Sequence, residues 1–194
     1  MAYTSCAAEL AASIAQNCDQ PLVGGYTGMG ILIPAGSVSF VQDADNKRKI
    51  KSIVTEKVFV VDNVTATPFT GSTTAGNSDS GYPAFTKTLS VRVPMRGADT
   101  SRDVIEGLVS SPDGYVAVLA KKDKSADGAF EVVGFLQPLM GDVTTVSRDE
   151  SANGGAWTIN LTCTEAWAEV SLVGADGTYE SAKEAFNELV AKAN

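Results

Sequence analysis

This sequence predicts a mainly β, α+β fold: a β-sandwich or partly closed barrel with short flanking helices. The 194 residues include 18 glycines, which indicates many turns, and several short segments are rich in β-branched and aromatic side chains. We expect a single domain over residues 1–194, since a chain of this length can bury its own core. It divides into an N-terminal helical segment at 1–23, a β-rich core at 24–173 and a C-terminal helix at 178–192.

The first expected element is a short amphipathic helix. Thr4 and Ser5 can cap this helix, which runs to about Asn17, and Pro21 prevents it from continuing. Its apolar stripe, with members four residues apart, comprises Cys6, Leu10, Ile14 and Cys18. We therefore expect its two cysteines to pack in the core as small buried hydrophobes.

Strands are expected next at Ile31–Ile33, Val38–Val41 and Ile50–Val61, where apolar and β-branched residues gather between turn residues. The stretch Thr65–Ala84 that follows is dominated by Thr, Ser and Gly. We predict a long polar loop there, which adds little to the core. Loops of this kind tend to be disordered or to become ordered against a partner.

The large side chains in and beside this polar stretch are Phe69, Tyr82 and Phe85. Because little else there is apolar, we predict that these three residues contact a neighbouring subunit. Truncation of the stretch is then expected to abolish oligomers.

The middle of the chain is expected to hold a strand and a helix. Polar and apolar residues alternate over Thr88–Val93, which predicts a half-buried strand that ends at Pro94. Asp99 or Thr100 then caps a helix near 100–110. The apolar positions of this helix recur at helical spacing and are Val104, Ile105, Leu108 and Val109.

Further strands and a last helix are expected in the second half of the chain. The strands are predicted at Tyr115–Lys121, Phe130–Leu136, Val143–Ser147, Trp157–Thr164 and Glu169–Val173. The first two form a hairpin, because their connector ends in Asp127-Gly128, and the next two form a second hairpin. Apolar residues alternate with polar ones along the fourth strand. Ser181 and Glu184 form a capping-box pattern for the helix at 178–192.

No residue is predicted to be catalytic, to bind a cofactor or to hold a metal ion. The sequence contains no histidine, which excludes histidine-based acid–base catalysis and histidine metal ligation. Its three cysteines lack CxxC spacing, so they predict buried packing and not a zinc motif. The segment Asn77–Pro83 superficially resembles the nucleophile region of serine proteases but has no histidine partner. We therefore expect a protein that is not an enzyme.

The charge balance bears on partners and location. Lys and Arg number 15 and Asp and Glu number 23, which gives a formal net charge of −8. Nucleic-acid binding requires clustered Lys and Arg, so we expect no specific nucleic-acid binding. No apolar stretch reaches the length of a membrane helix, and the first residues lack a signal-peptide pattern. We expect no membrane insertion and synthesis in the cytoplasm.

In the second half of the chain, the return strand Phe130–Gly134 is followed by a strand, a charged loop and the segment Asn153–Thr162. This order resembles the tail tube (major tail) proteins of bacteriophages, over roughly Phe85–Leu172. The resemblance implies a virion structural protein, assembled in the host cytoplasm as a homo-oligomer together with other virion proteins. It also implies hexameric rings that stack into a hollow tube, and a negative charge agrees with a conduit in which DNA slides.

Other interpretations stay open. A capsid-decorating or head–tail joining protein would use the same β framework. A carbohydrate or cell-surface binding module would expose aromatic side chains, for which Tyr26, Tyr82 and Trp167 are the candidates, unless Trp157 and Trp167 pack in the core. A hydrolase that uses only carboxylates is disfavoured. Assembly state separates these classes, since a structural protein forms rings or tubes and a binding module or enzyme can act as a monomer.

Overall fold

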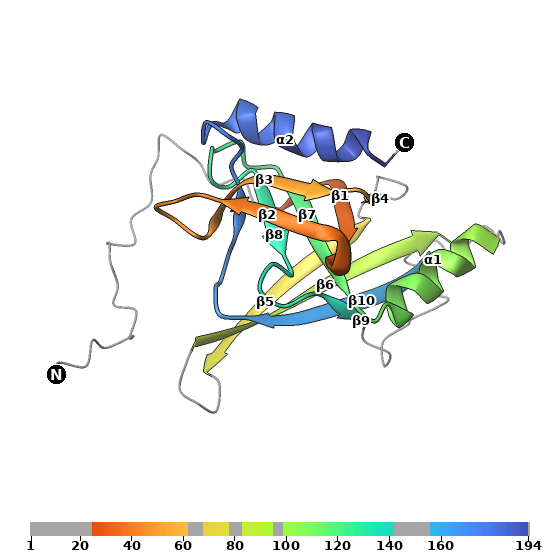
Figure 1. Cartoon of the computed structure of the whole chain (residues 1–194). Helices are drawn as coiled ribbons and strands as arrows, with labels where there is room; N and C mark the ends of the chain where they lie inside the picture. The colour runs from red at the N-terminus through yellow and green to blue at the C-terminus, as the bar shows by residue number, and fades with distance from the viewer. Residues whose placement is uncertain (1–24, 62–67, 78–82, 95–98, 142–155, 194) are drawn as a thin grey trace.

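The computed structural model describes residues 25–61, 68–77, 83–94, 99–141 and 156–193. The described residues form three layers (Figure 1). Helix α2 (Tyr179–Ala191) covers one face of a seven-stranded sheet, and a four-stranded sheet together with helix α1 (Asp99–Ser110) covers the other. The mainly β, α+β fold is confirmed, in the form of a sandwich of two separate sheets.

The seven-stranded sheet has the strand order β2-β3-β11-β8-β7-β1-β4. Its strands are β1 (Tyr26–Pro34), β2 (Val38–Gln42), β3 (Lys49–Thr55), β4 (Phe59–Val61), β7 (Tyr115–Lys121), β8 (Phe130–Val133) and β11 (Ser171–Leu172), and a 3-10 turn (Ala35–Ser37) joins β1 to β2. Strand β11 pairs in parallel with β3, and the other pairs are antiparallel. Strand β7 is apolar along nearly its whole length because both of its faces are covered.

The four-stranded sheet has the order β5-β6-β10-β9. Its strands are β5 (Phe69–Asn77), β6 (Pro83–Pro94), β9 (Met140–Gly141) and β10 (Ala156–Glu165). Strand β10 pairs with β6 along its whole length, from Ala156 opposite Pro94 to Glu165 opposite Phe85. Its inward residues include the buried Ile159, and its outward residues are polar, which confirms the predicted alternation.

Two apolar clusters form the core, one on each face of the seven-stranded sheet. The cluster between the two sheets includes Leu32, Phe69, Leu89, Leu119 and Ile159. The cluster beneath α2 includes Ile31, Val118, Val132, Phe186 and Leu189. Consecutive residues of a central strand therefore point into different clusters, as Ile31 and Leu32 of β1 do.

Helices α1 and α2 lie where the sequence predicted helices, but the cap of α2 differs. Thr178 is the N-cap residue, and its hydroxyl accepts a hydrogen bond from Ser181 N–H (3.2 Å). The predicted cap, Ser181, is the third residue of the helix, and its hydroxyl accepts from Asp176 N–H (3.3 Å). The helix begins two residues before Ser181, so the backbone N–H of Ser181 lies in the first turn and has no partner within the helix. The Thr178 hydroxyl accepts this hydrogen bond instead.

The predictions for one strand and for the polar loop that follows it were wrong. The segment predicted as one strand at Ile50–Val61 is divided into β3 and β4 by a bend after Thr55. The predicted loop at Thr65–Ala84 contains β5, which pairs with β6 from Phe69 to Asn77. Threonine favours strands, and β5 buries only one large side chain, so it needs little apolar sequence to remain in the sheet.

Some predicted features fall outside the described residues. They are the helical segment 1–23 with Cys6 and Cys18, the contact residue Tyr82 and the strand Val143–Ser147. Among the helices that the structure describes, none combines the length and the apolar character needed to cross a membrane.

Candidate functional site

Strand β5 is an edge of the four-stranded sheet. Strand β6 pairs with one side of β5, and no described residue pairs with the other side. Over Phe69–Asn77 it contains no charged residue and no proline, its register with β6 is regular, and residues 70–76 are all exposed. Proteins usually protect a long edge with Lys, Pro or a bulge, because its unpaired backbone groups can bind another chain. Strand β5 is therefore a candidate surface for pairing between subunits.

The register shows which backbone groups face the open side of β5. The Arg92 N–H donates to the Pro68 carbonyl (2.8 Å), so these two residues form a hydrogen-bonded pair. Hydrogen-bonded and non-hydrogen-bonded pairs alternate along an antiparallel ladder. The N–H and C=O groups of Gly71, Thr73 and Ala75 therefore point to the open side, and those of the intervening residues point to β6.

Uncharged polar side chains cover most of the outer face of the four-stranded sheet, and Arg92 lies at one end of this face, in the row beyond Ser90. The register aligns three rows across β5, β6 and β10, which are Thr70, Ser90, Asn160; Ser72, Thr88, Thr162; and Thr74, Thr86, Thr164. Ser90 Oγ donates to Asn160 Oδ1 (2.6 Å), and the hydroxyl oxygens of Thr86 and Thr164 are 3.4 Å apart. This hydroxyl face, defined by the three rows, contains no charged side chain of its own, and Arg92 borders it at one end.

Of the three predicted contact residues, the structure describes Phe69 and Phe85. Phe69 is 2% exposed, and its ring centroid lies 5.2 Å from that of Tyr26 at the core between the sheets. The ring packs in the core of its own chain, whereas a residue that contacts another subunit is expected at the surface. Phe85 is half-buried near the other end of the β5–β6 pairing, opposite Ala75. The structure therefore does not bring Phe69 and Phe85 together.

A buried ion pair lies on the inner face of the same sheet and was missed in the sequence. Lys87 Nζ is 2.5 Å from Glu165 Oε2, and the two side chains are 2% and 0% exposed. Glu165 Oε1 also accepts a hydrogen bond from Leu136 N–H (2.9 Å). The strand alternation held a signal, because Lys87 shares a face with Leu89, and Glu165 shares a face with Cys163.

Cys163 lies beside this ion pair. It is 6% exposed and free, which confirms core packing for this cysteine. Burial raises the pKa of its thiol to about 12, and the negative charge of Glu165 adds to the effect. The thiol is therefore a neutral part of the core at physiological pH.

A polar cluster closes the core near the β5 edge. Tyr26 Oη donates to Glu131 Oε2 (3.2 Å), and Lys121 Nζ pairs with Glu131 (3.2 Å) and with Glu169. Burial, together with the charge of Glu131, raises the pKa of Tyr26 above its ordinary value. These groups satisfy one another and form part of the framework that holds β1, β7 and β8 together.

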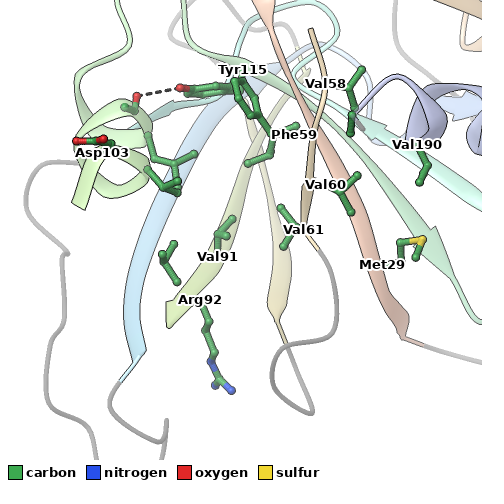
Figure 2. A pocket seen from close by; sticks show the side chains of 16 residues that line it. Met29, Val58, Phe59, Val60, Val61, Val91, Arg92, Asp103, Tyr115 and Val190 are labelled. Carbon is green, nitrogen blue, oxygen red and sulfur yellow. Dashed lines mark hydrogen bonds between the residues drawn. The ribbon is translucent and has the colours of Figure 1, made fainter. Parts of the chain in front are cut away.

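An apolar groove of about 770 Å³ surrounds strand β4, which is an edge of the seven-stranded sheet (Figure 2). Phe59 and Val61 lie on one side of β4, and Val58 and Val60 lie on the other. The first side faces β6 and α1, and the second faces the end of α2, while β1 lies beside β4 in the sheet. This β4 groove is thus apolar on both faces of one edge strand.

No family model, curated protein or solved structure matches the chain. Its function is therefore inferred from the open β5 edge, the hydroxyl face and the β4 groove. In the part of the chain that the structure describes, no group of three or more His, Cys, Asp or Glu side chains is placed to hold a metal ion.

Of the aromatic residues considered for a ligand-binding module, those that the structure describes are held by other side chains. Trp167 stacks on Phe135 with ring centroids 6.0 Å apart, and the Arg48 guanidinium lies 6.0 Å from the Trp167 centroid. Trp157 and Trp167 are half-buried and pack against the two core clusters. Tyr26 is also half-buried, with its ring on the core and its hydroxyl on a carboxylate. These rings act mainly in packing.

Proposed function

We propose that the protein is a structural subunit of a phage virion, and that its copies form rings that stack into the tail tube through which DNA passes. The observation that carries this proposal is the open β5 edge, which is uncharged and regular over Phe69–Asn77 and exposed over residues 70–76. The resemblance of the sequence to tail tube proteins supplies the form of the assembly, a hexameric ring. The proposed role requires no catalytic residue, cofactor or metal ion.

Pairing of β5 with an edge of the next copy would extend the four-stranded sheet from one subunit to another. The opposite edge of this sheet is β9, which carries the exposed Met140 and has the exposed Leu136 nearby. A contact between two different edges is head-to-tail, and such contacts close into rings when the rotation between subunits allows it. One repeated backbone pairing is then sufficient to build the ring.

The hydroxyl face suits the wall of a DNA channel. DNA phosphates are held by clustered Lys and Arg, and the three rows of this face contain only Thr, Ser and Asn. The formal net charge of −8 further disfavours retention of DNA. These properties support a surface along which DNA moves without being bound.

The proposal is tested at Thr73, whose backbone N–H faces the open side of β5. Thr73→Pro removes this donor without breaking a hydrogen bond to β6, so we expect folded protein in short oligomers in place of rings. Thr73→Ala keeps the donor and should assemble like the unaltered protein. Light scattering gives the mass in solution, and negative-stain microscopy shows rings or tubes.

The other outcomes identify other roles. If the unaltered protein stays monomeric at high concentration, the proposal is wrong and a binding module becomes the better interpretation. If rings form only after capsids are added, a capsid-decorating or head–tail joining role replaces the tube. Rings of equal yield from Thr73→Pro and Thr73→Ala would show that β5 is not the contact.

A further inference from the structure

Exposed large hydrophobic side chains gather at the edges of the two sheets. In the described part of the chain they are Val41, Val54, Phe59, Val104, Leu136 and Met140. Leu136 and Met140 lie at or near β9, in the four-stranded sheet. The other four lie at the two ends of the seven-stranded sheet, with Val41 and Val54 on β2 and β3, and Phe59 and Val104 beside the β4 groove.

We infer that the β4 groove of one copy receives the β2–β3 hairpin of a second copy. This inference rests on the proposed self-assembly and adds to the β5 edge a separate interface in the other sheet. Strands β2 and β4 are the first and last strands of the seven-stranded order. Because the two surfaces differ, the contact is head-to-tail, which is the type that closes into rings.

The groove provides the receiving surface. Strand β4 pairs with β1 on one side, and no described residue pairs with its other side. Phe59 is 53% exposed and Val104 of α1 is 45% exposed. Arg92 contributes to the lining, but Figure 2 shows its side chain extending away from β4. An apolar surface on both faces of an open edge strand is suited to bury a second apolar edge.

The β2–β3 hairpin provides the entering surface. Val41 is 50% exposed and Val54 is 56% exposed. The register places Ser39 opposite Val54 and Val41 opposite Ser52, so both valines lie on the same face of the hairpin. Their exposure is unusual because strands otherwise place valine toward the core.

Charges beside the two surfaces are complementary. Asp103 and Glu106 are exposed on α1 around Val104, and the exposed Arg102 lies beside Asp103. Lys47 and Arg48 are exposed in the turn that follows Val41. The neighbouring lysines of β3 already have partners in the same chain, since Lys49 pairs with Asp127 and Lys51 pairs with Asp43. Lys47 Nζ donates to the Asp43 carbonyl (3.4 Å) and the Arg48 guanidinium lies over Trp167, but neither cation pairs with a carboxylate among the described residues. Both cations can therefore meet the two carboxylates of the helix, which favours a second copy as the occupant.

The apolar part of the contact is tested with Phe59→Ser and Val54→Ser. Both side chains are more than half exposed, so the fold should persist, which circular dichroism checks. Each substitution should weaken self-association at least about tenfold in sedimentation equilibrium. The measurement is made in the Thr73→Pro background, where pairing through β5 is removed and the remaining association reports this contact alone. Asn187→Ala, on the exposed side of α2, is the control and should change nothing.

The charged part is tested with two charge-reversed proteins in the otherwise unaltered chain. Lys47→Glu with Arg48→Glu makes both surfaces acidic, and Asp103→Lys with Glu106→Lys makes both surfaces basic. Each protein alone should associate at least about tenfold more weakly at 0.15 M salt, because like charges then face each other. Mixed in equal amounts, the two proteins should associate again, since every contact in an alternating ring is complementary.

The outcomes separate this contact from the proposed function. If the serine variants keep full association, or if the mixture shows no recovery, the proposed docking of β2–β3 on β4 is wrong. The proposed function still stands in that case, provided that the unaltered protein forms rings. If the unaltered protein forms no oligomer at any concentration, both are wrong. Recovery on mixing, with loss in each protein alone, is the result that we expect.

Discussion

The two buried charges, Lys87 and Glu165, depend on each other for their place in the core. Removal of an ion from water costs several kcal/mol, and only a close partner and further hydrogen bonds offset that cost. Here the offset comes from the 2.5 Å contact between the two side chains and from the Leu136 N–H. Loss of one partner leaves the other charge buried without compensation.

We therefore predict that Glu165→Leu lowers the free energy of unfolding by about 3–5 kcal/mol. The double variant Lys87→Met with Glu165→Leu removes both charges and should lose much less, because no unpaired ion remains. Urea denaturation followed by tryptophan fluorescence measures both. Equal losses in the single and double variants would show that the pair is not buried in the way described.

For single residues, the sequence predicted which side chains face the core better than it predicted which side chains pair with each other. Alternation along Trp157–Thr164 identified the inward residues of β10, including Cys163. Alternation also places Lys87 and Glu165 on inward faces, but it could not pair them, because they are 78 positions apart and charged residues are rarely buried. Their pairing became visible only once β6 and β10 were known to be neighbours.

Among the structural elements, the turn between β11 and α2 depends on two glycines with positive φ. Gly174 has φ of 70° and Gly177 has φ of 65°. A Cβ at Gly174 would lie 2.4 Å from the backbone carbon of Ser181, whereas a Cβ at Gly177 would meet nothing within 4 Å. Gly174 thus sets how closely the helix approaches the strand, and Gly177 only shapes the turn.

Gly177→Ala should lower the free energy of unfolding by about 1–2 kcal/mol, the cost of a left-handed conformation with a side chain. Gly174→Ala should lower it more, because the added methyl group also displaces the first turn of α2. Thermal unfolding followed by circular dichroism compares the two variants. Equal losses would mean that the helix shifts at no cost, and would contradict the close approach at Gly174.

Helices α1 and α2 and most of the described strands were predictable because their periodicity is local. Strand β5 was not, because its Thr, Ser and Gly residues also suit a loop, and only pairing with β6 makes them a strand. The β5 edge and the β4 groove were missed for the same reason. Both depend on the order of strands in a sheet, which no local pattern contains. The prediction of Phe69 as a contact followed from treating its strand as a loop.

For the whole molecule, hydrogen exchange gives a test of the proposed assembly. In the monomer, the amides of Gly71, Thr73 and Ala75 should exchange rapidly, because they face the open side of β5. The amides of Thr70, Ser72 and Thr74 should be protected by β6. On assembly the first set should become protected and the second set should change little. Unchanged exchange at Gly71, Thr73 and Ala75 in assembled rings would contradict pairing through β5.

Strand β11 also sets the order in which the surfaces of the protein can be completed. Ser171 N–H donates to the Arg48 carbonyl and Val173 N–H to the Ile50 carbonyl, at 2.9 and 2.8 Å. In the described sheet, the β2–β3 hairpin is joined to the other strands only through β11, and α2 packs against β3 from above. Both attachments come from residues that follow position 170.

During translation the hairpin must therefore wait, unattached, until more than a hundred further residues have been made. A nascent chain therefore cannot hold the entering surface of the proposed β2–β3 contact in place until its synthesis has passed β11. If the protein self-assembles as proposed, we expect this late attachment to keep unfinished chains from joining one another.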